Sequence, residues 1–152
     1  MLVPGDLMEG NLKHHGFHYE VKDPSFDGQT RLLLDLLPEK EGLTYHFCVG
    51  NHEINSWFKT IGMSPGRALV DKAVARGRND LRYLGQVTGY LMTDTGDPET
   101  DVKIELSHTE DRKAYAISYP IQKHIEAMPG GAKPHILLKA HLHNYSKIDE
   151  RN

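Results

Sequence analysis

The chain has 152 residues, a single cysteine and a formal net charge of −3 at pH 7. This length fits one domain, and 38% hydrophobic with 26% charged residues argues against disorder and against a coiled coil. No apolar run reaches about 18 residues, and the N-terminus lacks the basic and apolar regions of a secretory signal. We therefore expect a single cytoplasmic domain over residues 1–152, without membrane partners, and the acidic balance does not favour nonspecific DNA binding.

The pattern of apolar residues predicts strands alternating with helices, which is typical of an α/β domain. Strands are expected where β-branched and aromatic residues gather, and helices where apolar periodicity is bounded by proline or glycine. The expected elements, in chain order, are a short apolar segment at 2–4, a strand at 17–21, a helix at 28–37, a strand at 44–49, a helix at 65–77, one or two strands at 81–92, a strand at 102–107, a helix at 119–128 and a strand at 135–140.

Side chains that can bind a metal ion follow several of these expected strands, in a chain that holds ten histidines. Sites in α/β sheets form beyond the carboxyl ends of strands, where loops converge. A set of carboxylate, amide and imidazole donors suits Mn, Fe, Zn or similar ions better than Ca or a thiolate-bound metal. The candidate donors are Asp6, Asn51, His52, His108, His141 and His143.

These residues fall into motifs that resemble those of the calcineurin-like metallophosphoesterase superfamily. The motifs occur in the family's order and span nearly the whole chain, and the segments at 115–119, 122–123 and 133–135 are similar to phage and archaeal members related to DNA-processing phosphoesterases. The resemblance implies a layered αββα sandwich of two packed sheets flanked by helices. The matching segments are Gly5-Asp6-Leu7-Met8-Glu9, Gly50-Asn51-His52-Glu53, His108 and Ala140-His141-Leu142-His143.

The resemblance also implies which side chains bind metal. Asp6 would bridge two divalent ions, and Asn51, His108 and His141 would complete one of the two sites. His143 would bind the other ion. Mn is the first expectation for the metal, with Fe, Zn, Ni and Mg as alternatives and one or two ions per chain.

The implied reaction is hydrolysis of a phosphomonoester or phosphodiester by a metal-bound hydroxide, with nuclease activity among the candidates. His52 would act as the acid toward the leaving oxygen or stabilise charge there, and Glu53 would orient His52. The aromatic pair Trp57 and Phe58 has two interpretations, as core packing or as a stacking wall for a base.

The sequence departs from the family pattern most clearly at its start. The first family motif, D-x-H, is absent, Glu9 stands where the family often has Asp, and Ala140 replaces a glycine. Three explanations stay open: an N-terminally incomplete domain that lacks the first strand and helix, a natural form with one metal site, or substitute ligands from His14, His15 or His18.

Because the D-x-H motif is absent, the sequence also allows an alternative function. In that alternative the chain is a catalytically impaired or truncated module that binds a metal ion or a phosphate and acts through a partner. Absence of the first strand would leave a sheet edge uncovered, and a homodimer is one way to cover it.

Overall fold

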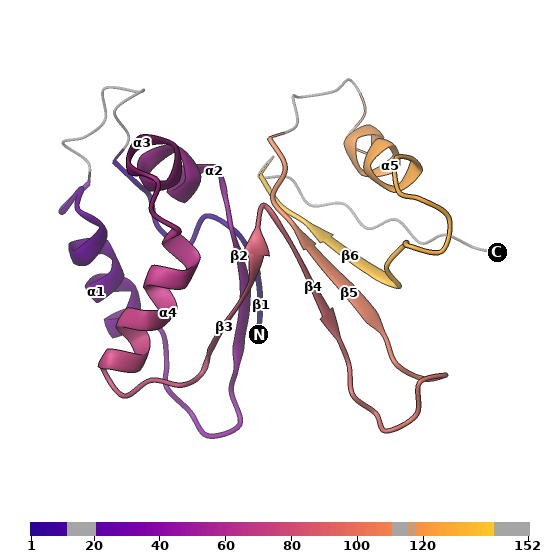
Figure 1. The fold of residues 1–152 in the computed structure, drawn as a ribbon, viewed down its shortest axis with the longest axis horizontal. Coiled ribbons are helices and arrows are strands. Elements are labelled where there is room, and N and C mark those ends of the chain that lie inside the picture. The colour runs from indigo at the N-terminus through magenta and orange to yellow at the C-terminus, as the bar shows by residue number, and fades with distance from the viewer. Residues whose placement is uncertain (12–20, 111–115, 117, 142–152) are drawn as a thin grey trace.

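The structure of this mixed α/β protein is a computed structural model that describes residues 1–11, 21–110, 116 and 118–141 (Figure 1). The strands of the described chain form two three-stranded sheets. In the first sheet, β1 (Leu2–Pro4), β2 (Tyr45–Val49) and β3 (Leu81–Gln86) are parallel, in the order β1-β2-β3. In the second sheet, β5 (Lys103–Ser107) lies between antiparallel β4 (Thr88–Met92) and parallel β6 (Ile136–Lys139).

Helices lie on the outer sides of the two sheets (Figure 1). On the first sheet, α1 (Phe26–Leu36) and α4 (Pro65–Ala75) cover the face that is turned away from the second sheet. The helix α5 (Tyr119–Glu126) lies on the far side of the second sheet. The expectation of a mixed α/β domain is therefore confirmed, with the helices near the predicted positions.

The core fills the space between the first sheet and its helices. Alternate β2 residues Tyr45, Phe47 and Val49 are 1–2% exposed and pack in one cluster with Leu69 and Ala73 of α4. This alternation follows from the period of two in a strand and explains why an aromatic, β-branched segment forms β2.

A continuous helical run after β2 was not predicted from the sequence. It consists of α2 (Asn51–Glu53), a π-helical turn η1 (Ile54–Phe58) and α3 (Lys59–Ile61). Trp57 is 5% exposed and packs edge-to-face on Phe26, with 5.1 Å between the ring centroids. This places Trp57 in the core, so only Phe58 of the aromatic pair stays at the surface as a candidate for base stacking.

Other boundaries differ only slightly from the predicted ones. Ser25 caps α1 by accepting a hydrogen bond from the Gly28 amide, so this helix begins two residues before its predicted start. Of the strand predicted at 17–21, only Val21 lies within the described residues, and it is not in a strand. No helix in the described ranges has the length and apolar character that crossing a membrane requires.

The C-terminal end of α1 is held by a buried arginine. Arg78 is 6% exposed and donates to the carbonyl oxygens of Leu34 and Leu37 at 2.9 and 2.8 Å. Asp80 accepts two further hydrogen bonds from Arg78, at 3.1 and 2.6 Å. The guanidinium thus satisfies helix carbonyls that have no partner inside the helix, and its charge is balanced by a carboxylate.

This ion pair predicts how stability depends on pH. The hydrogen bond from Arg78 lowers the pKa of Asp80 below its usual 3.8, so the pair stabilises the fold above that pH and loses its contribution as the pH falls further. We expect Asp80→Asn to lower the free energy of unfolding by about 2 kcal/mol at pH 7. In urea titrations between about pH 7 and pH 2.5, the difference from wild type should shrink below about pH 4; a difference that is independent of pH would contradict this assignment.

Candidate metal centre

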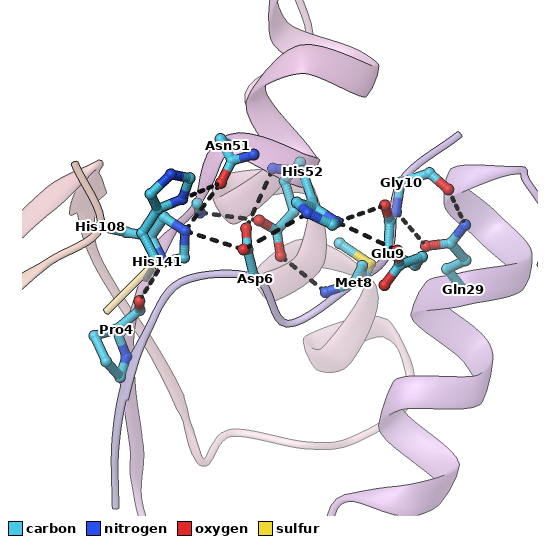
Figure 2. A network of polar contacts seen from close by, with 12 residues as sticks. Pro4, Asp6, Met8, Glu9, Gly10, Gln29, Asn51, His52, His108 and His141 are labelled. Atoms are coloured by element: carbon cyan, nitrogen blue, oxygen red, sulfur yellow. Dashed lines mark hydrogen bonds and ion pairs between the residues drawn. The ribbon is translucent and has the colours of Figure 1, made fainter. Parts of the chain in front are cut away.

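Four of the predicted ligands meet where strands from both sheets end (Figure 2). Asp6 and Asn51 follow β1 and β2, and His108 and His141 follow β5 and β6. In each sheet the two strands concerned are parallel, so their carboxyl ends lie at one edge. The convergence expected from the sequence is therefore observed for these four residues.

The donor atoms of these residues form a chain of short contacts. His108 Nε2 lies 3.0 Å from Asp6 Oδ2 and 3.0 Å from Asn51 Oδ1. His141 Nδ1 lies 3.0 Å from the same Asn51 oxygen. These are ordinary hydrogen-bond separations, and they also match the spacing of about 3.0 Å between neighbouring ligands whose metal bonds of about 2.1 Å meet at right angles.

The imidazole of His108 is surrounded by hydrogen-bond acceptors. Its Nδ1 lies 2.7 Å from the Pro4 carbonyl oxygen, which can only accept, so this nitrogen carries a proton. In the neutral ring Nε2 then has a lone pair that faces the oxygens of Asp6 and Asn51. A proton on Nε2 makes these contacts favourable, and a metal ion bound by Nε2 and the two oxygens would do the same.

Two pKa shifts reflect the same arrangement. Burial lowers the pKa of His108, but its hydrogen bonds to Asp6 and to the Pro4 carbonyl outweigh burial and raise the pKa above its ordinary value. For Asp6, burial raises the pKa, while the hydrogen bond and the charge of His108 bring it below its ordinary value. Without a metal ion, the centre thus favours an imidazolium beside a carboxylate.

Sharp backbone turns let the ligands approach one another. Asp6 and His141 have positive φ angles of 53° and 106°, which are uncommon for residues other than glycine. A Cβ atom at Gly5 would lie 2.5 Å from His108 Nδ1, and one at Gly50 would lie 2.1 Å from Asp6 Oδ1. The glycines of the two motifs thus leave room for the imidazole and the carboxylate.

Val87, the single residue between β3 and β4, ties the two sheets together at this edge. Its amide donates to the Val49 carbonyl at 3.1 Å, and its own carbonyl accepts from the His108 amide at 2.7 Å. Val87 has a φ of 64°, which is strained for a β-branched residue. These two bonds fix the end of β2 beside the end of β5 and so bring Asn51 close to His108.

His52 lies at the exposed side of the centre. Its Nε2 is 3.9 Å from Asp6 Oδ2, and its side chain is 26% exposed. Its Nδ1 lies 3.0 Å from the Glu9 carbonyl oxygen and 3.6 Å from the Glu9 carboxylate. The residue that orients His52 is therefore Glu9, which sequence reasoning noted only as a departure from the family pattern.

Glu53 does not occupy the position that was expected for it beside the His52 ring. It is fully buried, and its two oxygens accept hydrogen bonds from the backbone amides of Met8 and Gly50 at 2.8 and 2.9 Å. Burial raises the pKa of Glu53, although these amide bonds favour the charged form. Glu53 thus joins the loop after β1 to the turn after β2, and it acts on the centre by holding Asp6 and Asn51 together.

Several predicted ligands lie outside the residues that the structure describes. These are His143, His14, His15 and His18. Within the described residues, no group of three or more His, Cys, Asp and Glu side chains is arranged to hold a metal ion, and the cluster reported above depends on the Asn51 amide as a fourth donor. The metal-binding role of this cluster therefore stays a prediction.

Comparisons with protein families, with curated proteins and with solved structures give no match to this chain. These comparisons therefore add no support for the candidate site, and its assignment rests on the contacts described above.

A substitution at Gly50 tests the close approach of the two loops. Because a Cβ here would collide with the side chain and the backbone of Asp6, we expect Gly50→Ala to displace the carboxylate and to weaken Mn²⁺ binding at least tenfold. Isothermal titration calorimetry measures this, with Gly130→Ala as the control because a Cβ there meets nothing within 4 Å. Equal affinities of the two variants would contradict the observed packing.

Replacement of Glu53 tests its role as the link between the loops. A glutamine offers one acceptor oxygen and turns an NH₂ group toward the other backbone amide, so one buried donor loses its partner. We expect Glu53→Gln to lower the free energy of unfolding by about 1–3 kcal/mol in urea titrations. Glu110→Gln, at a side chain that is 56% exposed, is the matched control; a Glu53 variant as stable as this control would refute the link.

Proposed function

We propose that this chain is a metal-dependent phosphoesterase that hydrolyses phosphomonoester or phosphodiester bonds. The observation that carries the proposal is the set of three 3.0 Å separations among the donors of Asp6, Asn51, His108 and His141. The order of the four motifs along the chain supports the same assignment, and so does their place at strand ends. In this proposal the two sheets and their outer helices correspond to the layers of a calcineurin-like sandwich.

Four residues of the centre would bind the ion, and a fifth residue, His52, would take part in the reaction. Asp6, Asn51, His108 and His141 would hold the ion, and the Pro4 carbonyl fixes the His108 ring so that Nε2 faces it. A divalent ion bound there supplies Lewis-acid polarisation of a phosphoryl oxygen and of an attacking water. The side chain of Asp6 is 20% exposed, so a substrate phosphate can approach the centre from solvent.

His52 has the geometry of a proton donor to the leaving group. Because the Glu9 carbonyl accepts from Nδ1, the other ring nitrogen is free to carry a proton toward a phosphate beside Asp6. Protonation of the leaving oxygen by His52 would then complete the hydrolysis.

One observation favours the alternative of a binding module without catalysis. The sequence contains no D-x-H motif, and the described cluster offers its donors to at most one ion. A single ion can still grip a phosphate through its open coordination positions. In this case the chain would bind a phosphate or a phosphorylated partner without turnover.

Metal titration combined with an assay of hydrolysis tests the proposal. We expect wild-type protein to bind Mn²⁺ and to hydrolyse bis-p-nitrophenyl phosphate or p-nitrophenyl phosphate. His141→Ala should weaken Mn²⁺ binding at least tenfold, and His52→Ala should keep the ion but lose on the order of 100-fold in kcat. His135→Ala is the matched control, because His135 is exposed and bonds the Lys103 amide in another part of the second sheet.

The outcomes separate the two functions. Binding of Mn²⁺ without hydrolysis of either ester would favour the binding module. Unchanged binding and turnover in His141→Ala would refute the site itself.

A further inference from the structure

A buried polar contact fastens α5 to the second sheet. His124 of α5 donates from Nε2 to Glu105 Oε1 of β5 at 2.7 Å. The two side chains are 17% and 1% exposed. The interior between a helix and a parallel strand pair is normally apolar, so a charged residue at this position needs a specific reason.

Other polar atoms beneath α5 lack partners. Within the described part of the chain, Glu105 Oε2 and the hydroxyl of Ser107 make no hydrogen bond, although both side chains are fully buried. Residues two apart on a strand face the same side, so both groups lie on the face that α5 covers. Tyr90, the partner of Glu105 across β4 and β5, also interacts with this carboxylate. His124 is the side chain that contacts it from α5, so loss of the His124 bond would break the polar link between the helix and the sheet.

The remaining packing of α5 is limited. Of its eight residues, only Pro120 is buried. Lys139 of β6 donates to the Pro120 carbonyl at 3.4 Å, which is a long contact. The short bond between His124 and Glu105 is therefore the strongest directional restraint that the described structure shows on this helix.

The helix belongs to the unit that delivers two of the proposed ligands. Strand β5 ends one residue before His108, and α5 leads into β6, which ends two residues before His141. Among the described strands, β6 pairs on one side only, with β5. A helix that is fixed in rotation and position over these strands limits the movement of β6 and of the turn that follows it.

We propose that Glu105 and His124 are positioning residues for the metal centre. Their buried bond sets the place of α5 over β5 and β6, and through these strands it holds the imidazoles of His108 and His141 at ligand separation. The metal-binding part of this inference rests on the proposed function. Ligand sets must be held to within about 0.5 Å, which explains why a directional bond is preferable to nondirectional apolar packing.

Two variants separate the effect of the directional hydrogen bond between His124 and Glu105 from the effect of packing beneath α5. The double variant Glu105→Leu with His124→Leu replaces the polar pair by apolar side chains, and such replacements often preserve or raise stability. Glu105→Gln keeps an acceptor oxygen for His124 but removes the charge. Leu69→Val, in the core of the first sheet at 1% exposure, serves as a control that lowers stability without altering α5.

The measurements are urea unfolding, Mn²⁺ affinity by calorimetry, and ¹H–¹⁵N spectra of the imidazoles in metal-free protein. We expect the double variant to bind Mn²⁺ at least tenfold more weakly and to lose the signal of the hydrogen bond between His141 and Asn51. Glu105→Gln should retain both properties, and Leu69→Val should keep wild-type affinity at reduced stability.

Three results would overturn the inference. The first is wild-type Mn²⁺ affinity and a wild-type imidazole spectrum in the double variant, and the second is loss of Mn²⁺ affinity and of the hydrogen-bond signal in folded Glu105→Gln. The third is an Mn²⁺ affinity that falls with stability in every variant, including Leu69→Val. If the double variant does not fold, the metal-free spectrum of His124→Ala decides, because this variant removes the bond: loss of the signal of the hydrogen bond between His141 and Asn51 supports the inference, and its retention overturns it. If wild-type protein binds no Mn²⁺, the proposed function fails, whereas the metal-free spectra still test whether the pair positions His141.

Discussion

The candidate centre depends on the environment of one imidazole. His108 is 2% exposed, and acceptor oxygens lie against both of its nitrogens. The Pro4 carbonyl fixes the proton on Nδ1 and therefore directs the other nitrogen at Asp6 and Asn51. The Pro4 carbonyl suits a neutral ring, but the two oxygens at Nε2 are best satisfied by a positive charge there, which either a second proton or a metal ion can supply. The proposed chemistry follows from the second possibility.

The backbone brings these groups together from distant parts of the sequence. The His108 amide bonds the Val87 carbonyl, and the Val87 amide bonds the end of β2, so both sheets are joined at the edge where their strands end. Glu53 adds a second link between the loops after β1 and β2. The strain at Val87 and the positive φ of Asp6 are therefore located where the site requires close approach, which is where strained backbone is commonly found.

Most strands and the polar side chains that follow them could be predicted from the sequence because both obey local rules: β2 has an aromatic and β-branched composition, and a polar motif follows it directly. The helical run at 51–61 was not predicted, although its apolar residues have helical spacing, because it opens with the polar Gly50-Asn51-His52-Glu53 motif, whose composition is equally typical of a loop. The contacts of Glu9 with His52 and of Glu53 with Met8 could not be predicted, since no local pattern specifies which loop a carboxylate will meet. The pairing of His124 with Glu105 could not be predicted either, because it depends on how α5 lies over the sheet.

The central claim is that residues from both sheets share one metal ion. Pulsed electron paramagnetic resonance of protein loaded with one equivalent of Mn²⁺ tests it directly, because nitrogen nuclei bonded to the ion give characteristic couplings. The account predicts couplings from two imidazoles, of which one disappears in His141→Ala and the other in His108→Ala. A wild-type spectrum of fully hydrated Mn²⁺, or couplings that survive both substitutions, would contradict it.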